Sequence, residues 1–411
     1  MATLKVSNFG PIKELDWEVE DYCLFIGPPA SGKSTIAKLL YYFLTIDESI
    51  SQYLGGLYIS SPHALDTGEE VQRCIKTLKK KFIDFFGSTK EMQPFSISYS
   101  DDAARKIKIE LKGGYPELLF SEGYNLEEMF KQIQEIPLSE RFFTTSAFLK
   151  EWLMKDLELS SNIIYIPAGR SILSYYELSP AEPTLSFFFD RIKGIKGHFN
   201  QSFDEIIKDW ENLHTSKIDK ASLSHAIGLI RKILKGEYRY IDREDRLYYN
   251  ETDYVKLSLA SSGQQEAVWI LQLIFFLILD NTKATLLIEE PEAHLFPEAQ
   301  MYMVRLISLF ARLNGNRVII TTHSPYILTT INNLLYASKI GAKHPEEANE
   351  TIPSYCWIDY AKVGSYYISG GRLESLLEDD IKQIRAEKID EISSVLNEQF
   401  DELLNLYDDE V

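Results

Sequence analysis

The segment at residues 27–35 reads GPPASGKST and fits the phosphate-binding pattern G-x-x-x-x-G-K-[ST]. Its glycines permit tight turns, in which successive backbone N–H groups surround phosphate oxygens at a helix N-terminus. Lys33 would reach the β- and γ-phosphates, and the Ser34 hydroxyl would complete a Mg²⁺ shell. The two prolines carry no N–H, so the donors must begin at Ala30. We therefore expect a nucleoside triphosphate to contact Gly27, Pro28, Ala30, Ser31, Gly32, Lys33, Ser34 and Thr35.

An acidic pair ends the apolar run ATLLIEE at residues 284–290. At the end of a strand beside a phosphate loop, Glu289 would hold Mg²⁺ through water. Glu290 would then be placed to polarise the water that attacks the γ-phosphate. A plain acidic cap after a strand is common, but four apolar residues before the pair and Pro291 after it are more specific. The pair predicts a magnesium ligand and a general base.

Two further short segments carry residues suited to phosphate. The run ASSGQQE lies just before a long apolar stretch, and small hydroxyl residues with a glycine at a helix N-terminus form an anion site. Taken alone, that pattern is only a weak helix cap. His323 ends the apolar run VIITTH, and a lone histidine is more often a core residue. The candidate anion contacts in the first segment are Ser261, Ser262, Gly263 and Gln264.

Apolar runs of strand length would hold these residues together. The runs at residues 21–26, 284–289 and 317–322 each lead into polar residues, as buried parallel strands do. Residues 35–44 and 267–279 have the length and spacing of helices. The phosphate loop therefore lies between a strand and a helix, which is the context that the pattern requires.

The remaining patterns predict hairpins and further helices. Alternating runs at residues 3–19, 95–111 and 238–249 predict antiparallel hairpins. Residues 125–234 are mainly helical in pattern, broken by a buried strand and a loop at the segment NIIYIPAGRS. The stretch from Asp379 onward predicts an acidic amphipathic helix. Its apolar face would consist of Ile389, Ile392, Leu396, Phe400, Leu403 and Tyr407.

The composition bounds the class of protein. A chain of 411 residues with 45% hydrophobic content can bury a large core, and its length favours two or three domains. The longest apolar run, thirteen residues from Ala267, is better explained as a core helix than as a membrane span. The N-terminus lacks the regions of a signal peptide, so we expect a cytosolic protein. Three cysteines far apart in sequence predict neither a disulfide framework nor a zinc site.

The net charge of −18 disfavours general binding to nucleic acid, because an acidic protein repels phosphate backbones. Local contact with DNA stays possible at two basic segments, residues 73–82 and 191–199. Segments of this kind are more often the solvated face of a helix.

Six segments occur in a characteristic order: LKVSNFGPIKEL, GPPASGKST, YIPAGRS, ASSGQQE, LLIEEPEAHLFP and TTHSP. In their order and chemistry they resemble ABC-type ATPases of the group that contains the RecF, SMC and overcoming-lysogenisation-defect (OLD) families. The resemblance extends over residues 4–328. It implies that Ser261 and Gly263 face the γ-phosphate held by another subunit, and that His323 senses that phosphate. The catalytic residues would then be Glu290, His323 and Lys33.

Two details of the resemblance bear on function. The segment EEPEAHLFP followed by TTHSP favours the OLD-like branch, many of whose members act in phage defence. After Pro325 the sequence has no D-x-D pair and no E-G turn after an apolar strand, so we expect no TOPRIM nuclease domain within it. The stretch between Lys33 and Gly263 also lacks the sustained heptads of an SMC arm. The middle of the phosphate loop reads Pro-Ala where relatives often have Asn-Gly, which should still bind phosphate.

The expected fold class is α/β: a P-loop ABC-type ATPase with a mixed sheet core, an antiparallel β lobe and a helical insertion. Residues 1–120 would form the N-terminal part of the ATPase domain with the antiparallel lobe, and residues 121–250 a mainly helical insertion. Residues 251–335 would carry the segment ASSGQQE, which resembles the signature of ABC-type ATPases and is called the signature segment here, together with the acidic strand and His323. Residues 336–411 would form a C-terminal helical extension.

The expected function is ATP hydrolysis with Mg²⁺, in which ATP-driven dimerisation controls a separately encoded nuclease or toxin, in anti-phage defence. Two alternatives stay open: a DNA-repair or recombination clamp of RecF or SMC type, and a regulator that sequesters a toxin. A transporter subunit is disfavoured by the long spacing between phosphate loop and signature. GTP is disfavoured because no N-K-x-D motif is present. We expect a homodimer or higher oligomer and no membrane contact.

Overall fold

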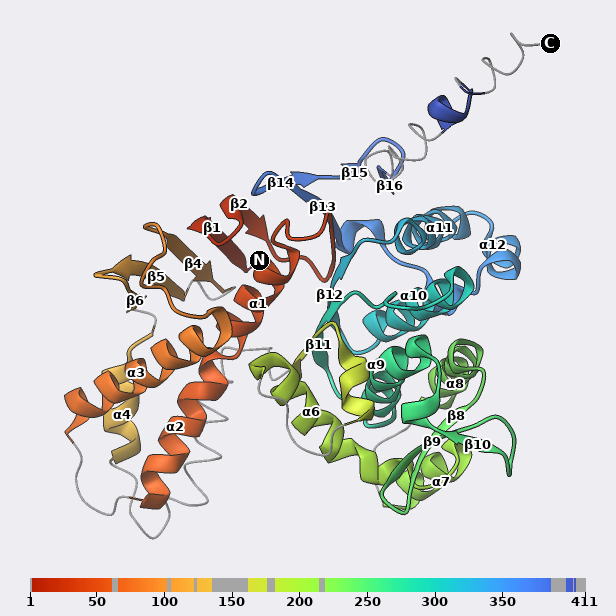
Figure 1. Cartoon of the computed structure of the whole chain (residues 1–411), viewed down its shortest axis with the longest axis horizontal. Coiled ribbons are helices and arrows are strands. Elements are labelled where there is room, and N and C mark those ends of the chain that lie inside the picture. The colour runs from red at the N-terminus through yellow and green to blue at the C-terminus, as the bar shows by residue number, and fades with distance from the viewer. Residues whose placement is uncertain are drawn as a thin grey trace.

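The computed structural model is built around one mixed sheet of eleven strands, in the order β6-β5-β4-β1-β2-β14-β13-β3-β12-β11-β7 (Figure 1). It describes residues 2–60, 66–101, 105–121, 124–134, 162–175, 182–213, 219–385, 397–401 and 403. The strands of this sheet are β1 (Thr3–Phe9), β2 (Ile12–Glu18), β3 (Tyr22–Ile26), β4 (Ser96–Ser100), β5 (Lys106–Lys112), β6 (Tyr115–Phe120), β7 (Asn162–Ile166), β11 (Ala284–Glu289), β12 (Arg317–Thr322), β13 (Val363–Ser369) and β14 (Arg372–Ser375).

The parallel part of the sheet consists of β13, β3, β12, β11 and β7. Successive side chains of a strand point to opposite faces, so Leu24 of β3 lies in one hydrophobic core and Phe25 in the other. Both side chains are fully buried. A strand covered on both faces reads as a continuous apolar run, which is why the sequence pattern predicted β3, β11 and β12. Their parallel arrangement is confirmed.

The antiparallel part of the sheet extends from β2 to β6. β1 pairs with β2 and with β4, and β5 pairs with β4 and β6. The turn between β1 and β2 contains Gly10 at a φ of 54°, a conformation that glycine adopts without a steric cost. The predicted hairpins at residues 3–19 and 95–111 are confirmed, and the antiparallel lobe of the expected fold is present.

The helices cover the sheet on both faces (Figure 1). One core packs α1 to α4 against the antiparallel strands and one face of β3, and the other packs α6 to α11 against the opposite face of the parallel strands. The helices are α1 (Lys33–Leu44), α2 (Ile46–Ser60), α3 (Thr67–Phe86), α4 (Leu126–Gln134), α6 (Pro183–Lys196), α7 (Phe203–Leu213), α8 (Lys220–Leu234), α9 (Ser262–Leu279), α10 (Pro297–Arg312), α11 (Pro325–Gly341) and α12 (Pro345–Thr351).

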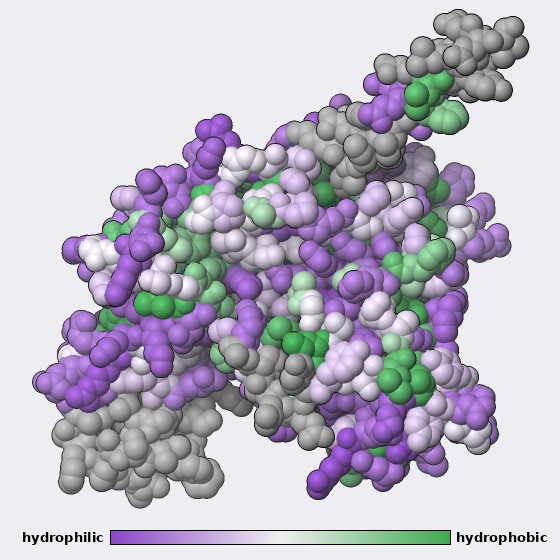
Figure 2. Space-filling model, viewed as in Figure 1, coloured by the Kyte–Doolittle hydropathy of each residue, from purple (hydrophilic) through white to green (hydrophobic). Residues whose placement is uncertain are grey.

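Helix α9 begins within the segment ASSGQQE, and most of its residues are apolar. By length and composition alone it could cross a membrane, but 83% of its residues are buried inside the protein. The prediction of a core helix is therefore confirmed. The surface in Figure 2 is largely hydrophilic, with separate hydrophobic areas, and α9 contributes little to it.

The region after residue 336 differs from the expected helical extension. After α11 and α12 the chain forms β13 and β14, which enter the main sheet beside β3 and β2. Residues 370 and 371 are both glycines with positive φ, and they make the tight turn of this hairpin. The predicted helix does not begin near Asp379, because β15 (Leu377–Glu378) pairs with β16 (Gln383–Ile384) across that segment. Farther along the same stretch, residues 397–401 and 403 are helical.

The predicted apolar face of a C-terminal helix lies mostly outside the described residues. This applies to Ile389, Ile392, Leu396 and Tyr407. Phe400 and Leu403 are described, and both are exposed.

The expected insertion at residues 121–250 is also only partly helical. Its segment β7 forms the last strand of the main sheet, paired with β11. The hairpin of β8 (Glu237–Ile241) and β9 (Glu244–Tyr248) confirms the third predicted hairpin, and β10 (Tyr254–Lys256) adds a third strand to it. The region therefore contributes to the sheet that carries the site.

Candidate active site

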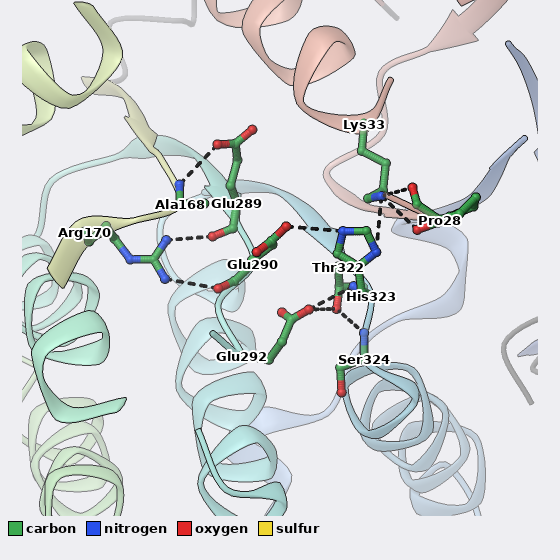
Figure 3. Close-up of polar contacts among 11 residues, drawn as sticks. Pro28, Lys33, Ala168, Arg170, Glu289, Glu290, Glu292, Thr322, His323 and Ser324 are labelled. Carbon is green, nitrogen blue, oxygen red and sulfur yellow. Dashed lines mark hydrogen bonds and ion pairs between the residues drawn. The ribbon is translucent and has the colours of Figure 1, made fainter. Parts of the chain in front are cut away.

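Three neighbouring parallel strands bring the predicted site residues to one edge of the sheet. β3 leads into the phosphate loop, β11 ends at the acidic pair, and β12 ends just before His323. The carboxyl ends of parallel strands lie at the same edge, which is where ligands bind in open α/β sheets. Figure 3 shows Lys33, Glu290 and His323 gathered there. The strand order explains why segments far apart in sequence meet.

The phosphate loop has the backbone that its sequence predicts. Gly27 has a φ of 154°, and a Cβ at this position would lie 2.4 Å from the carbonyl oxygen of Ile368 in β13. Gly32 has a φ of 111°, and Ala30 adopts a left-handed φ of 60° despite its side chain. The hydroxyl of Ser31 is buried and has no hydrogen-bond partner among the described residues. Tight turns and an unpaired donor both fit a loop that binds phosphate.

Lys33 folds back onto its own loop. Its Nζ donates hydrogen bonds to the carbonyl oxygens of Gly27 at 2.8 Å and Pro28 at 2.9 Å, and it lies 3.5 Å from Nδ1 of His323. Burial lowers the pKa of the Lys33 ammonium, and the nearby carboxylates, first that of Glu290, oppose this shift. Phosphate oxygens are anionic and accept stronger hydrogen bonds than neutral carbonyl oxygens do. We therefore expect the Lys33 ammonium to turn toward bound phosphate.

The acidic pair divides into a buried and a half-exposed carboxylate. Glu289 is 6% exposed; one of its oxygens accepts a hydrogen bond from the N–H of Ala168 at 3.1 Å, and the other is buried with no partner among the described residues. Glu290 lies 3.2 Å from Nε2 of His323 (Figure 3). A neutral imidazole with its proton on Nε2 would accept from Lys33 and donate to Glu290. The two carboxylates therefore have different surroundings, as their predicted roles require.

A third acid, Glu292, is part of this cluster and was not predicted. One of its oxygens accepts hydrogen bonds from Oγ1 of Thr322 at 2.6 Å and from the backbone N–H of His323 at 2.9 Å. Its other oxygen is buried without a partner among the described residues, and burial raises the pKa of the carboxyl. The segment EEPE contains this third acid, so the sequence held a signal for its place in the cluster. Glu292 links the loop after β11 to the end of β12 and so positions His323.

The signature segment caps helix α9. Ser261 and Gln264 form a capping box, in which each side chain binds the backbone N–H of the other residue, and Gln264 also donates to the carbonyl oxygen of Leu234. Ser262 is exposed. A Cβ on Gly263 would lie 2.6 Å from the carbonyl oxygen of His294. Among the contacts described for this chain, none joins residues 261–264 to the phosphate loop.

The site residues of one chain therefore form two groups. Lys33, His323 and Glu290 lie together, whereas residues 261–264 contact the loop that follows the acidic pair. The structure also contains a buried arginine, Arg170, from the segment YIPAGRS, for which the sequence patterns predicted no role. The contacts of these residues with nucleotide and metal stay predictions.

Comparison with known proteins finds one family model, described as "AAA ATPase domain", that matches residues 145–328. No curated protein matches the chain. Among solved structures, an SMC head bound to the C-winged helix domain of ScpA has 14% identity, covering 91% of this chain and 97% of that one, with a TM-score of 0.43. The SMC head domain from Thermotoga maritima has 13% identity, the same coverage and a TM-score of 0.39. A dimeric bacterial ABC transporter cassette has 12% identity, the same coverage and a TM-score of 0.32.

Similarities this low establish no function, so the identification depends on the family match and the site. The matched residues include the segments YIPAGRS, ASSGQQE, LLIEEPE and TTHS. The phosphate loop lies outside them in sequence, but strand β3 places it directly beside β12 in the sheet. A triphosphate held at that loop would therefore lie next to the acidic pair and the histidine. Over residues 145–328 the chain is thus similar to AAA ATPase domains, and the phosphate loop, the acidic pair and the histidine meet beside one another as an ATPase site requires.

Proposed function

We propose that ATP binding joins two copies of this protein, and that this dimerisation controls a separately encoded effector. The position of the signature segment carries the proposal. Ser262 is exposed, and within the described residues the segment contacts the loop at His294 rather than the phosphate loop of its own chain. A second copy could bring its signature to that loop and complete the site.

Large apolar side chains around the site support self-association. Leu259 lies just before the signature and is 74% exposed; Phe296 follows the acidic loop and is 76% exposed. Tyr326 follows His323 and is 52% exposed. Covering these side chains with another protein surface would remove apolar area from water, which favours association. All three flank segments that would face a second copy.

Magnesium fits the donors at this edge of the sheet. Ser34 is exposed at the start of α1, and Glu289 keeps one buried oxygen without a partner in the described chain. Mg²⁺ takes hard oxygen ligands and retains several waters, so one hydroxyl, one carboxylate through water and the phosphates suffice. The ion would neutralise the charge that develops on the phosphates.

The effector, a nuclease or toxin acting in phage defence in the cytosol, is proposed from the resemblance to the OLD-like branch. A DNA clamp is the second candidate, and the charges disfavour it. Arg73 of α3 is paired with Glu69 and Glu70, and Lys196 at the end of α6 with Asp245. Both basic segments are thus partly neutralised.

The Glu290→Gln variant tests the dimer. An amide cannot accept the proton of the attacking water, so this variant should bind ATP, stop hydrolysis and accumulate as a dimer. Light scattering after size exclusion should give twice the monomer mass with ATP and the monomer mass without it. The double variant Lys33→Ala/Glu290→Gln should stay monomeric with ATP. A monomer for Glu290→Gln at saturating ATP would sink the dimer proposal.

The effector is tested separately. The product of a neighbouring reading frame, co-purified with tagged Glu290→Gln protein, should be retained in an ATP-dependent manner. Retention of duplex DNA in place of a protein would favour the clamp.

A further inference from the structure

A buried arginine lies between the acidic pair and the signature helix. Arg170 follows β7 in the short 3₁₀ helix η1 (Arg170–Ser174), and its side chain is 0% exposed. Its Nη1 donates to the carbonyl oxygen of Glu289 at 2.7 Å, and its Nη2 donates to that of Glu290 at 3.0 Å (Figure 3). Nη1 also donates to the carbonyl oxygen of Pro167 at 2.6 Å. The guanidinium therefore binds the main-chain carbonyl groups of the acidic pair.

The other side of Arg170 is bound to the signature helix. Glu266, in the second turn of α9 and 2% exposed, accepts from the backbone N–H groups of Arg170 and Ser171, each at 3.0 Å. Its Oε2 lies 3.4 Å from Nε of Arg170, and that Nε also donates to the carbonyl oxygen of Glu266 at 3.3 Å. The buried positive and negative charges thus compensate each other, as buried charges must.

The main chain at Glu290 needs such support. Glu290 has a φ of 43°, in the left-handed region, which is sterically unfavourable for a residue with a side chain. Strained conformations of this kind persist only where the surroundings hold them. The N–H of Glu290 donates to the carbonyl oxygen of Thr321 at 2.9 Å, and Arg170 binds the carbonyls on both sides of the Glu290 Cα. Both peptide planes around this Cα are therefore fixed, and with them the direction of the side chain.

We propose that Arg170 is a positioning residue for ATP hydrolysis, which holds Glu290 in its left-handed conformation and, through Glu266, makes that position depend on helix α9. A shift of α9 then moves the main chain of Glu290, because Glu266 and Arg170 form one continuous hydrogen-bonded unit between them. Arg170 itself contacts no reacting group. The proposal rests on the ATPase activity and is independent of the effector and of the dimer.

The Arg170→Lys variant is the first test. Lysine keeps the charge next to Glu266, but its single ammonium cannot replace a guanidinium that binds four carbonyl oxygens. We expect kcat to fall on the order of 10²-fold, as for a catalytic group displaced by about 1 Å. The Kd for ATP should change less than about twofold, since the phosphate loop keeps all its contacts. A kcat within twofold of wild type in a folded variant would overturn the proposal.

A matched control separates positioning from general destabilisation. Arg105, whose side chain is 13% exposed, also lies in an acidic network: it pairs with Asp101, which follows β4, and with Asp47 of α2. Arg105→Lys makes the same chemical change away from the site. Both variants should lower the melting temperature, but only Arg170→Lys should lower kcat. Equal losses of kcat in both would identify a purely structural role and overturn the proposal.

Two further variants test the path. In the Glu290→Gln background, Arg170→Lys should cause no additional loss of the residual single-turnover rate, because the group that it positions is already gone; a further loss of about 10²-fold would refute the assignment. As a single substitution, Glu266→Gln should also lower kcat. In the double variant with Arg170→Lys, the loss of kcat should be no larger than in Arg170→Lys. Additive effects would overturn the link to α9. Glu266→Gln also keeps the test decisive if Arg170→Lys fails to fold.

Discussion

If each active centre takes its phosphate loop from one chain and its signature from the other, two inactive variants should restore each other. We choose Lys33→Ala for the loop. For the signature, Gly263 is unsuitable, because any Cβ would strike the carbonyl oxygen of His294 within the same chain. Ser262 is exposed and is the first residue of α9, where a carboxylate suits the helix dipole. Ser262→Glu should therefore fold, and it should lose activity only because its carboxylate repels the γ-phosphate.

The magnitude follows from the charges. A carboxylate about 4 Å from a γ-phosphate oxygen, at an effective dielectric constant near 20, costs about 4 kcal/mol, or roughly a thousandfold in rate. Ser262→Gln, which has the same shape without the charge, is the matched control and should retain most activity. Each single variant should thus be inactive. After random exchange at equal amounts, about half of the dimers are mixed and each has one complete site, so about a quarter of wild-type activity should return.

The assay is ATP turnover after subunit exchange, with two tags to prove that exchange occurred. A second mixture, of wild type with the double variant Lys33→Ala/Ser262→Glu, covers the case in which one site cannot work alone. Its mixed dimers would have no complete site, so exchange should lower turnover from about half to about a quarter of wild type. No rescue in the first mixture together with an undiminished half in the second would refute a shared site.

Other variants test individual contacts. Lys33→Ala should abolish hydrolysis, because it removes the only side-chain charge of the loop that can reach the β- and γ-phosphates; normal turnover would make the loop structural. Gly263→Ala should lower the free energy of unfolding by about 1–3 kcal/mol, seen as a lower melting temperature, since the added Cβ meets a backbone atom. Lys81 of α3 is partly buried, and desolvation lowers its pKa to about 8. The unfolded chain therefore binds more protons between pH 8 and 10.5, and stability should rise with pH by a few kcal/mol at most, a rise that Lys81→Met should remove. The isolated protein should bind duplex DNA with a Kd at or weaker than roughly 10⁻⁵ M at physiological salt; tight, salt-sensitive binding would favour the clamp.

The sequence predicted the parts of the site that depend on local patterns. The phosphate loop, the acidic pair and His323 each follow an apolar run, and a run of that kind is readable because both faces of the strand are buried. It could not predict Arg170. The partners of this side chain are mainly carbonyl oxygens of residues far away in the chain, and every residue has a carbonyl. Only the fold shows which ones are near.

The C-terminal strands were missed for a different reason. Residues 325–351 are largely helical, and the acidic tail suggested that the helical pattern continued. The run VGSYYIS is short and contains small polar residues, so its alternation is weak. The pair Gly370–Gly371 was the one local sign of a hairpin turn. The sequence did not show that the edge of β3 opposite β12 needed a pairing strand, which β13 supplies.

The position of β3 in the sheet has a consequence for how the protein is made. Its two neighbours, β12 and β13, both come from the last quarter of the chain. At typical rates of synthesis, roughly 15 to 60 s pass between the emergence of β3 and that of β12 from the ribosome. During that time an apolar strand has two unpaired edges, which is a condition that invites pairing with other chains. The nascent chain should therefore depend on chaperones, and a transcript cut short before β13 would yield a protein unable to hold ATP rather than a partly active enzyme.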